Sequence, residues 1–131
     1  MRALIAVLLG GAVGTSLRLL TDDLIVHHDN EFPWSTLIIN IVGSFVLALL
    51  VSRVWPVAPD WLRAGLGPGL VGGFTTFSAV MVSMVTLAAA GDILTALLYI
   101  VMTLVLGFGA AALGFWIALP RQTAPTIEVD E

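Results

Sequence analysis

The chain has 131 residues, of which 59% are hydrophobic and only 11% are charged, and its mean hydropathy is +1.05. A soluble domain this small needs more charge on its surface, so the composition indicates an integral membrane protein. The net charge of −4 says little about partners. The absence of cysteine excludes disulfides, thiol catalysis and cysteine metal sites.

Long apolar runs alternate with short charged islands, and each run is long enough to cross a bilayer. They predict transmembrane helices over residues 3–20, 34–54, 62–90 and 93–119, since crossing the roughly 30 Å hydrocarbon core takes about 20 helical residues. The polar, acidic residues 120–131 are expected to form a disordered tail. Residues 1–119 are therefore expected to form one all-α membrane domain that leaves no room for a soluble catalytic domain, so an enzyme is not expected.

The first span carries small residues along its length and a single charge near its far end. Gly10 and Gly14 form a GxxxG pair, which is typical of membrane helices that pack closely. Arg18 could attract anions at a vestibule, but its position favours a side chain that reaches the membrane surface. In the acidic loop that follows, His27 and His28 are candidate metal ligands, although a solvated loop is favoured there.

The second and fourth spans each carry a stripe of uncharged polar residues. The stripes are Thr36, Asn40 and Ser44 in the second span and Thr95, Tyr99 and Thr103 in the fourth. Residues four apart lie on one helix face, so each stripe presents hydrogen-bond donors without charge. Such donors could line a path for a small anion. Hydrogen bonding between helices is the alternative for any single Ser or Thr, whereas a mid-span asparagine favours function.

The third span contains more glycine than close packing requires. Its small and helix-breaking residues are Gly65, Gly67, Pro68, Gly69, Gly72 and Gly73, followed at once by the polar pair Thr75 and Thr76. Because glycine and proline weaken a helix, we expect a break near residues 72–76. Backbone groups exposed by such a break often bind ions in transporters and channels, and a tolerated kink is the alternative.

The charged residues indicate a direction of insertion. Arg2, Arg53, Arg63 and Arg121 are expected on one side of the membrane, and most acidic residues on the other. By the positive-inside rule, both termini are then cytoplasmic. No Asp, Glu or Lys falls in the middle of a span, so the usual carriers of proton coupling are missing. This favours passive conduction and ranks a drug or small-cation exporter last.

Three segments, read together, resemble the Fluc (CrcB) family of small bacterial fluoride channels. They are residues 10–18 (GGAVGTSLR), 35–45 (STLIINIVGSF) and 72–78 (GGFTTFS). The resemblance implies an antiparallel, dual-topology-type dimer of four-helix subunits with two fluoride pores. It also implies a multi-pass protein of the bacterial inner (plasma) membrane that exports fluoride from the cytoplasm.

The same resemblance implies roles for individual residues. It places Asn40, Phe77, Ser78, Tyr99 and Thr103 along the pores, and the polar stripe adds Thr36 and Ser44, with Arg18 as a vestibule candidate. It further implies a structural sodium ion at the dimer interface, held by backbone carbonyls of Gly72 and Thr75. Fluoride is small and tightly hydrated, so a pore must replace its water with donors, and phenylalanine ring edges can supplement them.

Departures from the family pattern point to a partner. Val80 stands where the family has its second pore phenylalanine, Ser83 where it has a glutamate, and Leu19 where a tyrosine is usual. Because each pore takes its two phenylalanines from different subunits, a paralogue that keeps both would complete one pore with Phe77. The four-to-one arginine bias also disfavours insertion in both orientations. We therefore expect a heterodimer, with a homodimeric channel and a non-conducting structural subunit as alternatives.

Overall fold

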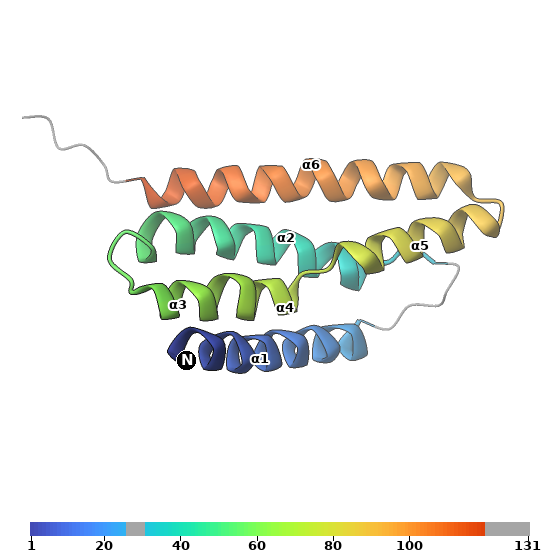
Figure 1. Cartoon of the computed structure of the whole chain (residues 1–131). Helices are drawn as coiled ribbons and strands as arrows, with labels where there is room; N and C mark the ends of the chain where they lie inside the picture. The colour runs from blue at the N-terminus through green and yellow to red at the C-terminus, as the bar shows by residue number, and fades with distance from the viewer. Residues whose placement is uncertain (26–30, 120–131) are drawn as a thin grey trace, which may run out of the picture.

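The computed structural model describes residues 1–25 and 31–119, and these ranges contain helices and no strands (Figure 1). The candidate metal ligands His27 and His28 and the expected tail over residues 120–131 lie outside the described residues. Four helical stretches are long and apolar enough to cross a membrane, namely Arg2–Leu24, Trp34–Val54, Asp60–Ala89 and Ile93–Ala118. The predicted all-α class with four spans is confirmed.

Two of these stretches are not regular α-helices throughout. The first and fourth are single helices, α1 (Arg2–Leu24) and α6 (Ile93–Ala118), whereas the second is α2 (Trp34–Leu49) continued by the π-helical segment η1 (Leu50–Val54). The third runs through α3 (Asp60–Ala64), the π-helical segment η2 (Gly65–Val71), α4 (Gly72–Phe74) and α5 (Phe77–Ala89). Helix α1 also continues beyond the predicted end at residue 20, through the acidic residues Asp22 and Asp23.

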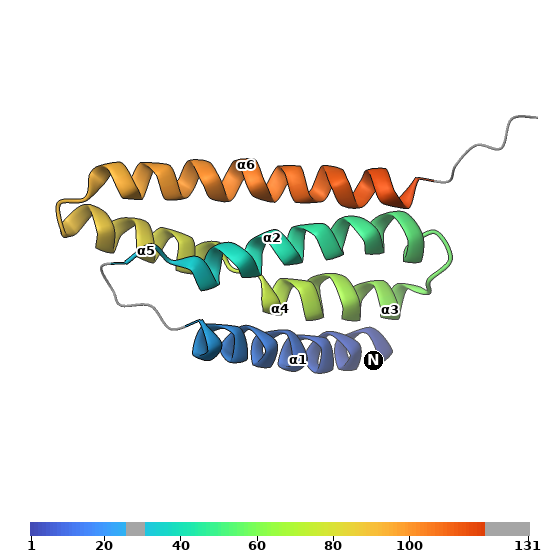
Figure 2. The same cartoon turned by 180° about the vertical axis from the view of Figure 1, so that it is seen from behind.

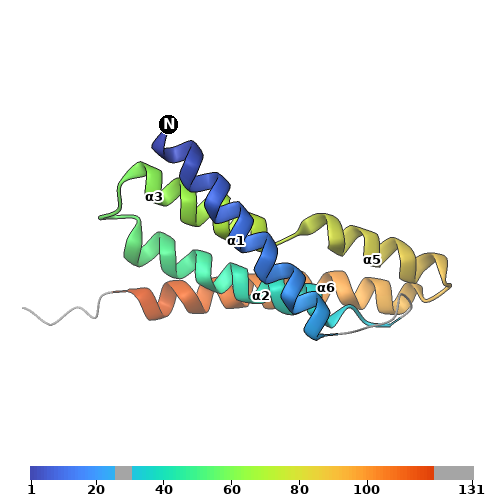
Figure 3. The ribbon, with the colours of Figure 1, turned by 90° about the horizontal axis from the view of Figure 1, so that it is seen from below.

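The helices lie in layers, with α1 and α6 on opposite sides of the bundle (Figures 1 and 2). Helix α2 packs along α6, α5 also contacts α6, and α1 packs mainly against α3, η2 and α4. The chain start and the end of α6 lie at the same end of the bundle. Figure 3 shows α5 leaving the line of α3 and α4 after the interruption between α4 and α5.

Glycine allows α1 to touch the backbone of the third span. A Cβ atom on Gly10 would overlap the carbonyl oxygen of Gly65, and one on Gly14 would overlap the carbonyl oxygen of Leu70. A Cβ on Gly73 would lie 2.9 Å from the carbonyl oxygen of Gly11. In lipid, helices associate through this kind of close packing rather than through hydrophobic burial. The glycine seam is therefore what holds α1 to the bundle.

The glycine-rich stretch, where the sequence predicts a weakened helix, is helical without interruption from Gly65 to Val71. Residues Gly65–Val71 form a π-helical segment that includes Pro68, and Gly65, Gly67 and Gly69 are buried within it. Proline has no N–H to donate, so a wider turn around Pro68 accommodates a ring that a regular α-helix would exclude. The helix is interrupted only beyond this stretch, at Thr75 and Thr76, inside the predicted window.

Side chains at both ends of α6 bind its free backbone groups. Arg53 donates from Nε to the carbonyl oxygen of Ala118 and from Nη2 to that of Ile117, both at 2.8 Å. At the other end, Asp92 accepts from the Thr95 amide at 3.1 Å, and its hydrogen bonds with Thr95 hold the Asp92 pKa below its ordinary value. These contacts fix the ends of α6 relative to α2 and to the loop after α5.

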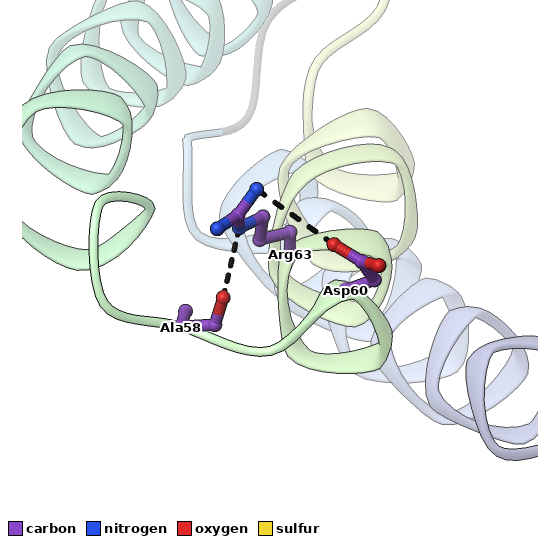
Figure 4. Close-up of polar contacts among 3 residues, drawn as sticks. All are labelled: Ala58, Asp60 and Arg63. Carbon is purple, nitrogen blue, oxygen red and sulfur yellow. Dashed lines mark hydrogen bonds and ion pairs between the residues drawn. The ribbon is translucent and has the colours of Figure 1, made fainter.

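The loop that enters α3 is tied by an arginine. Arg63 donates from Nε to the carbonyl oxygen of Ala58 at 2.9 Å and lies 3.7 Å from the carboxylate of Asp60 (Figure 4). Asp60 is in the first turn of this helical stretch, where a negative charge suits the helix dipole.

Substituting alanine for Gly14 tests the seam, because the added Cβ would overlap the Leu70 carbonyl oxygen. Helix α1 would have to move, and we expect a loss of about 1–3 kcal/mol in the free energy of unfolding. Thermal unfolding in detergent, followed by tryptophan fluorescence, measures the change. Gly109→Ala is the matched control, since a Cβ there meets no atom within 4 Å. Equal unfolding of the two variants would contradict the seam.

Candidate functional site

The third span is interrupted by two extended residues. Thr75 has φ −76° and ψ 155°, and Thr76 has φ −151° and ψ 122°, so α4 ends at Phe74 and α5 begins at Phe77. Extended backbone within a membrane span leaves polar groups without helical partners, which is tolerated only where other groups bind them.

Asn40 on α2 supplies those partners. Its Nδ2 donates to the Thr76 carbonyl oxygen at 3.0 Å, and its Oδ1 accepts from the Thr76 amide at 2.9 Å. Both backbone groups of Thr76 are thus bound by one side chain that lies 36 positions away in the chain. A mid-span asparagine is therefore explained first by this reciprocal pair, which fixes α2 against the break.

The threonine pair stabilises the break from within. The Thr75 hydroxyl donates to the Val71 carbonyl oxygen at 2.9 Å, and the Thr76 hydroxyl accepts from the Ala79 amide at 3.2 Å, which caps the start of α5. The hydroxyls of Thr76 and Ser78 are 3.1 Å apart. Much of the hydrogen-bonding capacity of the break is used to hold its own geometry.

Several carbonyl oxygens lose their helical donors at this point, among them those of Gly72 and Thr75. In a continuous helix, the amides of Thr76 and Ala79 would donate to the carbonyl oxygens of Gly72 and Thr75. These amides donate instead to the side chains of Asn40 and Thr76. No cluster of metal-binding side chains occurs among the described residues. The oxygens that could bind a cation in this region are therefore backbone carbonyls and neutral side-chain oxygens.

A groove of about 430 Å³ lies beside the break, between α2 and α6. Its polar lining consists of Asn40, Ser44, Thr75, Thr76 and Thr103, its aromatic lining of Phe77, Phe108 and Phe115, and the remaining lining is aliphatic or glycine. No charged side chain lines the groove. The structure thus brings together five of the predicted site residues in a groove lined by neutral polar groups, namely Asn40, Ser44, Thr75, Phe77 and Thr103.

Tyr99 and Thr36 lie in the core behind the groove rather than in its lining. The Tyr99 side chain is fully buried and packs edge-on against Phe32, with ring centroids 5.4 Å apart. Its phenol oxygen has no hydrogen-bond partner in the described ranges, although the hydroxyls of Thr36, Ser83 and Thr103 lie near it. An unpaired buried hydroxyl costs about 1–3 kcal/mol, and these three hydroxyls are the groups near enough to pair with the phenol.

Other predicted residues are separate from the groove. Arg18 is on α1, on the far side of the bundle from α6, and makes no hydrogen bond or ion pair within residues 1–25 and 31–119. Gly72 and Ser78 are exposed but do not line the groove. Phe108, which sequence reasoning did not single out, does line it.

Comparison with known proteins assigns the chain to a family. The model of the family described as CrcB-like protein, Camphor Resistance (CrcB), matches residues 5–115. The "Fluoride-specific ion channel FluC 2" of Halalkalibacterium halodurans is 40% identical over 129 residues, covering 98% of this chain and 94% of the relative.

Two further relatives have similar names. The "Fluoride-specific ion channel FluC" of Allorhizobium ampelinum is 39% identical, covering 89% of this chain and 99% of the relative. The "Fluoride-specific ion channel FluC 1" of Ligilactobacillus salivarius is 35% identical, covering 87% of this chain and 97% of the relative. The likeness therefore extends over nearly the whole of each chain.

The role of Asn40 in the fold can be tested by Asn40→Leu, which keeps the volume and removes both bonds to Thr76. An unpaired buried backbone group costs about 1–3 kcal/mol, so we expect a loss of roughly 2–5 kcal/mol and faster hydrogen exchange of the Thr76 amide. Thr86→Ala, which removes an exposed bond to Val82, is the control. The interpretation is wrong if the two variants unfold at the same temperature.

Proposed function

Because the chain belongs to the family of CrcB-like proteins, we propose that it is a subunit of a passive, fluoride-selective channel. Relatives that cover most of its length are named as fluoride-specific ion channels. The channel lets fluoride leave the cytoplasm down its gradient and so supports fluoride resistance. The observation that supports this best is the uncharged groove beside the break, with Asn40 and Thr103 among its polar groups. We propose conduction of an ion and no enzymatic reaction.

We propose that Asn40 binds the ion through the one side-chain N–H that is not bonded to Thr76. One N–H of Nδ2 donates to the Thr76 carbonyl, while Oδ1 is held by the Thr76 amide. The second N–H has no partner in the described part of the chain, so it can donate to an anion in the groove. A neutral donor binds fluoride less tightly than an arginine would, which allows the ion to leave.

The hydroxyl and aromatic groups of the groove differ in how readily they can contact an anion. Thr103 donates its hydroxyl proton to the Tyr99 carbonyl oxygen at 2.8 Å, so Thr103 must rotate before it can donate to an anion. Ser44 has no such bond within residues 1–25 and 31–119, and Phe77 keeps 66% of its surface exposed. Ser44 and the positive ring edge of Phe77 are therefore the groups most ready to face fluoride beside Asn40.

A structural sodium ion is a second part of the proposal. The carbonyl oxygens of Gly72 and Thr75, which the break releases from helical bonding, would hold it at the interface between two subunits. A hard cation prefers oxygen ligands, and the release of these two carbonyls supports the assignment. The ion would supply positive charge that neutralises carbonyl dipoles at the break.

We further propose that the partner is a paralogous subunit in antiparallel orientation. The residue in the position of the second phenylalanine, Val80, is aliphatic and fully buried, so it offers no aromatic edge to a pore. The arginine bias favours a single orientation in the inner membrane, with both termini cytoplasmic. The numbers 1 and 2 in the names of relatives support the existence of paralogue pairs.

Fluoride efflux from liposomes tests this proposal. This chain, its candidate paralogue and the two together are reconstituted at matched amounts, and release of fluoride and of chloride is recorded with ion-selective electrodes. We expect rapid fluoride release, with chloride retained, only from the mixture. Equal release of fluoride and chloride would overturn selectivity, and full fluoride release from this chain alone would show a homodimeric channel.

Phe77→Leu separates a pore-lining subunit from one that only stabilises its partner. The substitution removes an aromatic edge worth about 0.5–1.5 kcal/mol, so we expect fluoride release to slow by about three- to tenfold. Size-exclusion chromatography should show an unchanged complex with the paralogue. Unchanged release from an intact complex would assign the conducting role to the partner.

A further inference from the structure

Phe77 shares the groove with an aromatic ring on α6. Phe108 on α6 lines the same groove as Phe77, and 74% of its surface is exposed. Val80 occupies the position where a second phenylalanine is expected, but its side chain is fully buried against Leu37 and Tyr99. The aromatic surface available in the groove near the break therefore comes from α5 and α6 together.

The packing of α6 places Phe108 at the edge of the groove. A Cβ on Gly107 would lie 3.7 Å from the Ser44 hydroxyl, so α6 approaches α2 closely at that residue. A Cβ on Gly109 would meet nothing within 4 Å, so Gly109 faces away from the neighbouring helices. Phe108 lies between these two glycines and lines the groove that Ser44 also lines.

The Phe108 ring has a property that suits an anion pathway. A phenylalanine edge carries partial positive charge and attracts an anion without binding it as tightly as a cation would. The rest of the groove consists of neutral polar groups on α2, at the break and on α6, the rings of Phe77 and Phe115, and aliphatic or glycine residues. A second ring edge from α6 would add to them where Val80 contributes none.

We propose that Phe108 is a specificity-determining residue of the ion pathway, supplying from α6 an aromatic edge that complements Phe77. The inference rests on the proposed fluoride conduction and adds a residue to it. It applies to the pathway that this chain's own groove lines, whichever subunit completes that pathway.

The test compares Phe108→Leu and Phe108→Tyr in the conducting complex, reconstituted in liposomes. Leucine fills similar space without a ring, so fluoride release should fall by about three- to tenfold and the preference for fluoride over chloride should fall with it. Tyrosine keeps the ring and should restore both to at least half of the wild-type values. Trp116→Leu is the control, because Trp116 is an exposed aromatic residue of the same helix that does not line the groove, and its substitution should change neither.

Two results would overturn the inference. Unchanged release and selectivity in Phe108→Leu would mean that the ring is not in the pathway. The proposed function would still be supported in that case, provided that the wild-type complex releases fluoride. Loss of the complex on size-exclusion chromatography together with loss of release would assign Phe108 to subunit packing. If the wild-type complex releases no fluoride, the proposed function itself fails.

Discussion

The two hydrogen bonds between Asn40 and the backbone of Thr76 are the constraint on which the rest of the site depends. A membrane offers no water to an unpaired amide or carbonyl, so a helix can be interrupted in a span only where protein groups replace the lost bonds. One asparagine side chain binds both backbone groups of the residue in question. It thereby allows α5 to begin in a new direction at Phe77 and keeps the break beside α2.

The same break explains why the groove is polar at one point and apolar elsewhere. Thr75 and Thr76 expose hydroxyl and backbone groups next to Asn40, while aliphatic and aromatic side chains of α2, α5 and α6 form the remaining walls. No charge lines this groove, so an ion within it would meet dipoles and ring edges alone. The proposed preference for fluoride follows from this balance, since neutral donors can replace water and still release the ion.

Sequence reasoning predicted the spans because apolar length is a strong signal, and it placed the break because glycine, proline and the Thr75–Thr76 pair act locally. It could not predict that Gly65–Val71 would stay helical in a π-helical form, since that depends on the backbone of α1 against Gly65 and Gly69. Helical spacing grouped Tyr99 with Thr103. Packing then separated them, because α2 and Phe32 cover Tyr99 and leave Thr103 at the groove. Phe108 was missed because an apolar residue on a membrane helix carries no signal of its own.

The central claim is that this chain contributes to a passive pathway that discriminates fluoride from other small anions. The reversal potential of the current through the complex in a planar bilayer, with fluoride on one side and chloride on the other, tests it most directly. The account predicts a current that reverses near the fluoride equilibrium potential and does not shift when a proton gradient is applied. A reversal potential that follows chloride, or one that moves with the proton gradient, would contradict it.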